Sequence, residues 1–265
     1  MTKQQERARA RRRYEKVRRR EAQRAADRAR RLRVAAATGT VLVVVAALAL
    51  AGWWFSQEEP ASSTAQPSTA AGCVAPPAPL GTSAQLELPD KRTAEGRTFV
   101  ATVTTNCGDL ELTLDGAKAP QAVASFLELA RQNYWRNGPC HRLTASEGLK
   151  VLQCGDPTGT GQGDPGYGFG VENAPADGAY PRGTLAMART SDAEKGTGGQ
   201  FFIVYGDSSL PDPDGYTVFG TVTKGLDIVD RIAAAGIAPG GSSPTDGAPA
   251  APISILTVAV TEKKA

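Results

Sequence analysis

The chain has 265 residues, and its formal net charge of +3 is the sum of two very different parts. Residues 1–33 hold 15 of the 30 Lys and Arg and 4 of the 27 Asp and Glu, so this segment carries +11 and the remainder −8. This distribution argues against a basic nucleic-acid-binding domain beyond residue 33, and we expect no nucleic-acid partner. The single histidine, His141, excludes most His-clustered metal sites, and we expect no metal or other cofactor.

Residues 34–55 form an uncharged, mostly apolar run of 22 residues that ends in Trp53, Trp54 and Phe55. A helix of this length spans about 33 Å, enough for a hydrocarbon core of roughly 30 Å. With the basic segment before it, the positive-inside rule predicts a single-pass signal-anchor in the cell membrane, with a cytoplasmic N-terminus and the rest of the chain extracytoplasmic. The alternative is a cleaved signal peptide and a secreted protein, because residues 49–51 read Ala-Leu-Ala, a pattern that signal peptidase recognises.

Residues 1–33 are predicted to be a topology signal in the cytoplasm. A polar helix held on the anionic inner membrane surface is the alternative. Residues 56–92 are rich in Pro, Ser, Thr and Ala, so we expect a linker that buries no core and holds residues 93–263 away from the bilayer.

Residues 93–263 contain the patterns of a folded domain. Two alternating runs around residues 106–109 predict a β-hairpin. Pro120 begins an apolar stripe at helical spacing that reaches Tyr134, and a second helix is expected over residues 226–235. Residues 236–252 read as a Gly/Pro/Ser loop. Further strands are expected at residues 141–144, 149–153, 183–188, 200–205, 217–222 and 253–261. Many short strands with two separate helices predict a mainly β fold, a closed barrel capped by the two helices.

Three segments carry the residues with chemical interest. They read CHRL to VLQCGD over residues 140–156, GTLAMARTSD over 183–192 and GGQFFIVY over 198–205, followed by TVFGTV over 217–222. The order, spacing and residues of these motifs resemble those of the cyclophilin family of peptidyl-prolyl cis-trans isomerases, in particular its membrane-anchored or exported bacterial members. The resemblance covers about residues 95–262. It implies a closed eight-stranded antiparallel β-barrel with a helix over each end, and a shallow surface groove that binds X-Pro segments.

The resemblance also implies the roles of individual residues. The family's catalytic arginine falls on Arg142 and its supporting glutamine on Gln153. The substrate-binding groove falls on Phe202, Val151, Leu210, Gln200, Ala188, Leu149, Tyr216 and His141. His141 is expected beside the groove in a structural hydrogen-bonding role, because rotation about a peptide bond requires no proton transfer.

The chemistry is consistent with such residues. Rotation about an X-Pro bond has a barrier of about 20 kcal/mol, because the C–N bond has partial double-bond character. A catalyst must favour the twisted form, in which the prolyl nitrogen is pyramidal and can accept a hydrogen bond. A fixed guanidinium is a suitable donor because it stays charged at any working pH.

Some positions depart from the family pattern. Lys150 stands where an aromatic ring is common, and Leu149 beside it is expected to take part of that wall. Arg189 stands where Asn is common, and Tyr216 replaces a histidine at the groove edge. Ser209 replaces a Trp that is associated with cyclosporin, so we predict weak cyclosporin binding.

Four cysteines lie on the side of the membrane that is predicted to be exported, where disulfides persist, and four allow three pairings. In the family barrel, Cys140 and Cys154 bracket two neighbouring strands, which implies a cross-strand disulfide. Cys73 and Cys107 would then tie the linker to the first hairpin.

The leading interpretation is a membrane-tethered prolyl isomerase that assists the folding of exported, Pro-containing polypeptides. A weakly active or inactive cyclophilin-like module that binds Pro-containing segments is the alternative, and Lys150 and Arg189 favour it. A third interpretation, an interaction protein that acts through its cytoplasmic arm, rests on residues 1–33 alone.

Overall fold

The computed structural model describes residues 70–240 and 243–264. The predicted basic segment (1–33), the predicted membrane helix (34–55) and the first part of the predicted linker (56–69) lie outside the described residues. Among the residues that are described, no helix combines the length and the apolar character that a membrane span requires.

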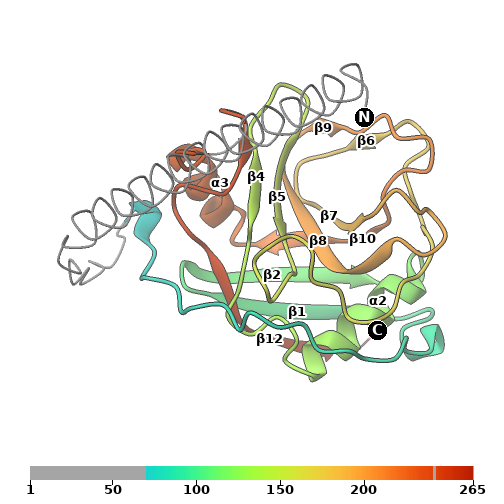
Figure 1. The fold of residues 1–265 in the computed structure, drawn as a ribbon. Helices are drawn as coiled ribbons and strands as arrows, with labels where there is room; N and C mark the ends of the chain where they lie inside the picture. The colour runs from blue at the N-terminus through green and yellow to red at the C-terminus, as the bar shows by residue number, and fades with distance from the viewer. Residues whose placement is uncertain (1–69, 241–242, 265) are drawn as a thin grey trace, which may run out of the picture. The chain divides into compact units, whose positions relative to one another are not determined.

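One antiparallel sheet dominates the domain (Figure 1). Its ten strands are, in chain order, β1 (Thr98–Thr105), β2 (Gly108–Asp115), β3 (Gly138–Pro139), β4 (Arg142–Thr144), β5 (Lys150–Cys154), β7 (Thr184–Arg189), β8 (Thr197–Gly206), β10 (Val218–Lys224), β11 (Asp246–Gly247) and β12 (Ser254–Glu262). In space the order is β11-β4-β5-β8-β7-β10-β2-β1-β12-β3. A separate small pair joins β6 (Ala179–Tyr180) to β9 (Ser208–Ser209).

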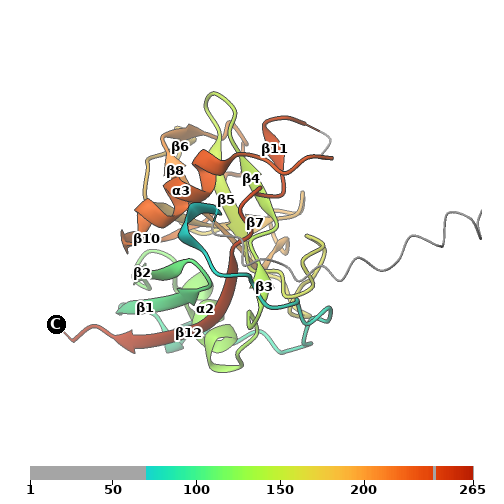
Figure 2. The ribbon, with the colours of Figure 1, turned by 90° about the vertical axis from the view of Figure 1, so that its left-hand side faces the viewer.

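The mainly β fold with two α-helices is confirmed, but the strand count differs from the predicted eight in a closed barrel. The sheet curls into a half-barrel, with β1, β2 and β12 below β4 and β5 in two views (Figures 1 and 2). Its terminal strands, β11 and β3, do not pair with each other. The predicted strand over 141–144 begins one residue later, at Arg142. The Cys140 N–H donates to the Ile253 carbonyl and so continues the pairing of β3 with β12. The strand β11 lies inside the predicted loop 236–252.

Two α-helices pack against the sheet, as predicted. Helix α2 (Pro120–Arg131) begins with proline in its first turn and packs on β2, β8 and β12. Helix α3 (Leu226–Ala235) packs on β2 and β8 through its apolar face. The predicted apolar stripe of α2 is buried except for Leu127, which is partly buried. Phe126 contacts the Trp135 ring beyond the end of the helix, with ring centroids 4.6 Å apart.

The alternation of side chains along β4, β5, β7 and β8 gives the sheet two distinct faces. One face carries a row of fully buried aliphatic side chains in register, namely Leu143, Leu152, Ile203 and Leu185. These belong to the main hydrophobic core, which the two helices also join. The other face carries a smaller apolar cluster centred on Val151, Phe202 and Tyr180.

Both predicted disulfides are confirmed. Cys73 bonds to Cys107, and Cys140 bonds to Cys154. The described end of the predicted linker therefore lies on the domain. The Val74 N–H donates to the Asn106 carbonyl at 3.0 Å, and the Leu86 N–H donates to the Pro165 carbonyl at 2.7 Å. These contacts and the disulfide hold residues 73–92 along the domain surface, in place of the free linker that their composition suggests.

Candidate active site

A row of side chains crosses the outer face of the sheet from strand to strand. Arg142 on β4 lies opposite Gln153 on β5, and Gln153 lies opposite Phe202 on β8. Phe202 in turn lies opposite Ala186 on β7. Because residues in register share a face of the sheet, a cation, an amide and an aromatic ring stand side by side.

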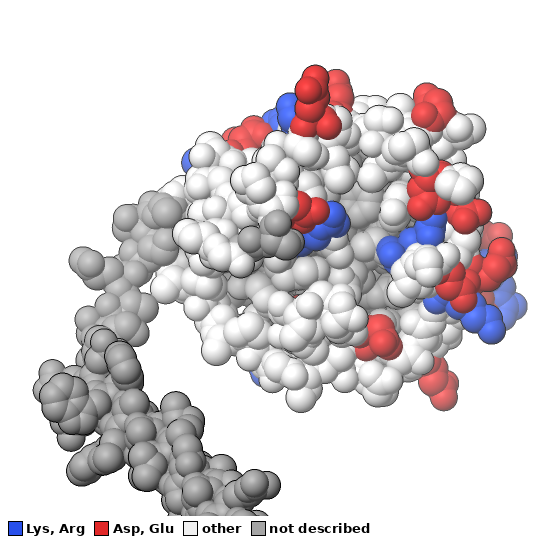
Figure 3. Space-filling view, turned by 45° about the horizontal axis from the view of Figure 1, so that its top comes forward, with Lys and Arg blue, Asp and Glu red and all other residues white. Residues whose placement is uncertain are grey.

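These side chains border a groove of about 320 Å³. It is lined by Arg142, Leu149, Val151, Gln153, Ala188, Arg189, Phe202, Leu210 and Tyr216. Its floor is apolar, because Val151 and Phe202 are buried and Leu149, Ala188, Leu210 and Tyr216 pack against them. In Figure 3 a hollow opens in a largely uncharged part of this face, and a basic and an acidic side chain touch at its rim.

Arg142 is the cation at the rim, and its guanidinium is held on two sides. Its Nη1 donates to Gln153 Oε1 at 3.2 Å. Its Nε and Nη2 donate to the two carboxylate oxygens of Asp246, at 2.8 and 2.7 Å. The hydrogen bond to Asp246 raises the pKa of Arg142 above its ordinary value, and the bond to Arg142 lowers the pKa of Asp246. Both groups are therefore charged throughout the neutral range.

Gln153 is itself held in place by Gln200. The Gln153 Nε2 donates to Gln200 Oε1 at 3.0 Å, and Gln200 Nε2 donates to the carbonyls of Gly161 and Gly163, both at 3.1 Å. Gln200 lines a second hollow of about 190 Å³, which shares Gln153, Ala188 and Arg189 with the groove. The predicted site residue Gln200 thus lies beside the groove, where it fixes the Gln153 amide.

His141, like Gln200, is a predicted site residue that does not line the groove. It is absent from the lining of both hollows. A Cβ at Gly161 would lie 3.4 Å from His141 Cδ2 and Nε2, so the ring packs against that glycine. Its Nδ1 is buried and has no hydrogen-bond partner among the described residues. Burial lowers the pKa of the ring.

The chain has matches among known proteins. The family model described as "Cyclophilin type peptidyl-prolyl cis-trans isomerase/CLD" matches residues 100–260. The chain belongs to the cyclophilin family. It is 43% identical over 206 residues, 71% of this chain, to a "Probable peptidyl-prolyl cis-trans isomerase B" of Mycobacterium tuberculosis. It spans 63% of that relative's length.

Two further relatives agree with this assignment. A "Probable peptidyl-prolyl cis-trans isomerase B" of Mycobacterium leprae is 43% identical over 207 residues, which cover 72% of this chain and 68% of the relative. A crystal structure of a Cryptosporidium parvum cyclophilin type peptidyl-prolyl cis-trans isomerase, determined in the presence of the dipeptide Ala-Pro, superposes with a TM-score of 0.50. It is 30% identical and covers 62% of this chain and 99% of that one.

The first departure from the cyclophilin pattern concerns the wall of the groove. Lys150 is exposed, whereas Leu149 is partly buried and lines the groove. Leu149 therefore takes part of the wall, as predicted, and the lysine charge lies outside the lining. Ser209 is exposed and is not a lining residue of the groove.

The second departure, Arg189, is bound within the protein. Its side chain is 4% exposed and pairs with Asp212, with Nη2 2.5 Å from Oδ1. Its Nε donates to the Gly215 carbonyl at 2.8 Å, and its guanidinium lies 5.0 Å from the centre of the Tyr216 ring. Such stacking of a cation on an aromatic face is favourable. Arg189 thus holds the chain segment that carries Tyr216, one wall of the cyclophilin groove.

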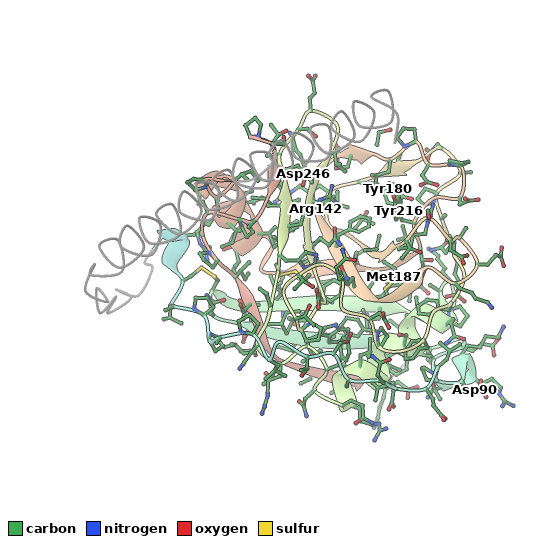
Figure 4. All side chains as sticks on the ribbon, in the orientation of Figure 1. Asp90, Arg142, Tyr180, Met187, Tyr216 and Asp246 are labelled. Carbon is green, nitrogen blue, oxygen red and sulfur yellow. A yellow bond between two sulfur atoms is a disulfide. The ribbon has the colours of Figure 1, made fainter. Side chains whose placement is uncertain are left out.

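Two residues of this cyclophilin site were missed in the sequence (Figure 4). Asp246 lies in the predicted Gly/Pro/Ser loop, far along the chain from Arg142, and neither periodicity nor motif identifies it. Tyr180 is fully buried, and its hydroxyl accepts a hydrogen bond from the Tyr216 N–H at 2.8 Å. In the sequence Tyr180 is an apolar residue between turns, and nothing in that pattern marks it as part of the site.

No cluster of three or more His, Cys, Asp or Glu residues within 70–240 and 243–264 is arranged to hold a metal ion. What the site offers is a positioned guanidinium beside an apolar groove. Such an arrangement can hold a ring of modest size and donate a hydrogen bond to a group at the ring's edge.

Proposed function

We propose that this chain is a peptidyl-prolyl cis-trans isomerase, which catalyses rotation about X-Pro peptide bonds. The observation that carries the proposal is the position of Arg142, a guanidinium oriented by Gln153 at the rim of a groove with an apolar floor. Family membership supports it.

The groove would hold the proline side of the substrate. Phe202 and Val151 form a rigid apolar floor, because both are buried and Phe202 packs edge-on against Tyr216 with ring centroids 5.7 Å apart. An apolar pyrrolidine ring gains free energy on leaving water for such a surface. With the ring fixed, the acyl part of the substrate is free to rotate about the C–N bond.

Arg142 would lower the barrier to that rotation. In the planar peptide the nitrogen lone pair is delocalised into the carbonyl, whereas in the twisted form it is localised and accepts a hydrogen bond. A donor placed at this nitrogen therefore stabilises the twisted form more than the planar one, which is the condition for acceleration. Arg142 suits the role because it is charged at any working pH and its position is fixed before the substrate arrives.

The substrates that this site supports are Pro-containing polypeptides. The Cryptosporidium parvum relative was crystallised in the presence of Ala-Pro, which agrees with recognition of a short X-Pro unit. We keep the prediction of weak cyclosporin binding. A titration with cyclosporin that reaches nanomolar affinity would contradict it.

We further propose that the domain works outside the cytoplasm, tethered by residues 34–55, and assists the folding of exported proteins. The uncharged run of 22 residues after a basic segment supports the tether. The two disulfides support an oxidising compartment. Fractionation of cells that express the full chain tests this. Full-size protein in the membrane fraction is expected, and a shortened protein in the medium would indicate the cleaved signal peptide instead.

The test of the isomerase uses a protease-coupled assay on the full chain with an Ala-Pro peptide. The wild type should accelerate cis-to-trans conversion, and Arg142→Ala should lower kcat/KM by about 100-fold or more, as the loss of other transition-state donors does. Arg182→Ala is the matched control, since Arg182 also makes a bidentate pair, with Asp230, but does not line the groove. Peptide binding by a wild type that has no turnover would favour the binding module.

A further inference from the structure

Asp246 stands out because it makes the strongest contact of the candidate catalytic arginine and comes from a segment with no assigned role. The two carboxylate oxygens accept from Nε at 2.8 Å and from Nη2 at 2.7 Å. Bidentate arginine–carboxylate pairs of this kind fix both the position and the plane of the guanidinium. Gln153 contributes a single hydrogen bond of 3.2 Å.

The backbone explains how Asp246 reaches this place. Strand β11 pairs with β4, with Asp246 opposite Thr144 and Gly247 opposite Leu143. Asp246 is therefore a diagonal neighbour of Arg142 on the same face of the sheet. The Ala145 N–H also donates to the Thr245 carbonyl at 2.8 Å, so the strand is fixed on both sides of the aspartate. Figure 4 labels the two side chains close together beside β4.

Some N–H groups of Arg142 are bound by neither Asp246 nor Gln153, and they indicate what the Arg142–Asp246 pair does. A guanidinium has five N–H groups. Two are bound by Asp246 and one by Gln153, which leaves one on Nη1 and one on Nη2 for another acceptor. The Arg142 side chain is 40% exposed, so substrate can reach these groups. Without Asp246, a long flexible side chain would rely on one hydrogen bond and on its own rotamer preferences for its orientation.

We propose that Asp246 is a positioning residue for Arg142, and that β11 is part of the active site. This inference rests on the proposed isomerase function. Asp246 holds the guanidinium in one orientation and leaves two N–H groups free at the edge of the groove. The carboxylate does not touch the substrate, so its removal affects the turnover of bound peptide more than peptide binding.

The test compares Asp246→Asn with Asp230→Asn in the full chain, by isomerase assay with an Ala-Pro peptide. The Arg182–Asp230 pair has side chains 42% and 44% exposed, against 40% and 41% for Arg142–Asp246, and lies away from the groove. Asp246→Asn should lower kcat about tenfold, equivalent to about 1.4 kcal/mol, with KM within about twofold of the wild type. Asp230→Asn should retain wild-type kcat and KM. Asp246→Glu, which keeps the charge, should recover part of the lost kcat.

The outcomes separate this inference from the proposed function. Wild-type turnover in Asp246→Asn, or a gain in turnover, overturns the positioning role while the isomerase stands. A wild type without turnover overturns the isomerase itself. If Asp246→Asn does not fold, the Nε–H NMR signal of Arg142 in the unchanged chain decides. A signal protected from exchange with water supports the pair, and one that exchanges as fast as the other exposed arginines contradicts it.

Discussion

The two faces of strands β4, β5, β7 and β8 are built from alternate residues of the same segments. One face belongs to the hydrophobic core, and the other carries the candidate active site. The inner row joins Leu143, Leu152 and Ile203 in a fully buried core. The outer row joins Arg142, Gln153 and Phe202, whose polar members are only half-buried. The inner row needs only helices and other strands to cover it. The outer row depends on a distant segment, β11, whose Asp246 holds its one charged group, Arg142. Neighbouring residues of one strand therefore serve different purposes: one packs in the core and the next lies at the candidate site.

The largest expected effect comes from truncating adjacent residues on the two faces of β5. Leu152→Ala should lower the free energy of unfolding by about 2–5 kcal/mol, because it leaves a cavity in a packed core. Val151→Ala, at the groove, should chiefly raise KM for an Ala-Pro peptide. Urea unfolding and the isomerase assay on both variants check this. Equal losses of stability with unchanged KM would contradict the division between the faces.

The two disulfides should both stabilise the fold, but we expect only one of them to affect catalysis. Removing either pair by double Cys→Ala substitution should cost about 3 kcal/mol of stability in the chain-entropy account. Cys140 and Cys154 flank Arg142 and Gln153 in the sequence, so loss of that disulfide should also lower kcat. Loss of the Cys73–Cys107 disulfide should leave kcat unchanged, because it ties residues near the hairpin turn. Thermal unfolding and turnover of both double variants check this. A kcat that falls on loss of Cys73–Cys107 but not on loss of Cys140–Cys154 would contradict the prediction.

Arg189→Ala should have a smaller effect, on the outer face alone. The guanidinium bonds Asp212 and Gly215 and stacks on Tyr216, so its removal loosens one wall of the groove. We expect KM to rise several-fold and stability to fall by about 2 kcal/mol, the order of a hydrogen bond to a charged group. Arg131→Ala is the control, since Arg131 pairs with Glu128 on the exposed side of α2 and should change neither quantity appreciably. A KM for Arg189→Ala equal to that of the wild type would show that the wall does not need this support.

The smallest effect is a pH dependence of stability from His141. Burial lowers its pKa in the folded state, so below about pH 6.5, the ordinary value, the unfolded chain takes up a proton that the folded chain does not. The contribution of His141 is thus full above that pH and is lost as pH falls toward the folded-state pKa, at no more than about 1.4 kcal/mol per pH unit.

His141 is the single histidine of the chain, which makes the control direct. The free energy of unfolding of the wild type, measured in urea between pH 7 and 5, should fall more steeply than that of His141→Asn. Identical slopes would show that the ring titrates alike in both states. Activity should not follow the same curve, because the proposed reaction moves no proton through this residue.

Local patterns were sufficient to predict most of the fold. The alternation around residues 106–109 predicted the hairpin of β1 and β2, and the predicted strands lie within three residues of the observed ends. Helical spacing located α2 and α3. Resemblance to the cyclophilins brought Arg142, Gln153 and Phe202 together, and register confirms that they are neighbours. It also paired the four cysteines correctly.

Contacts between distant segments were not predictable. Asp246 is 104 residues from Arg142 in the chain and sits in a stretch without periodicity. The composition of residues 73–92 indicated a free segment, but one disulfide and a few backbone hydrogen bonds hold them on the domain. The role of Arg189 depends on a turn that brings Asp212 and Tyr216 to it. In each case a polar group finds a partner that only the assembled fold brings near.

The most direct test of this account measures turnover and stability on the same preparation of Arg142→Ala. The account predicts a loss of kcat/KM of about 100-fold or more. It also predicts a free energy of unfolding within about 1 kcal/mol of the wild type, because Arg142 and Asp246 form a half-exposed pair. Turnover that survives the substitution would contradict the role of the outer row, and so would a loss of turnover that merely follows a loss of folded protein.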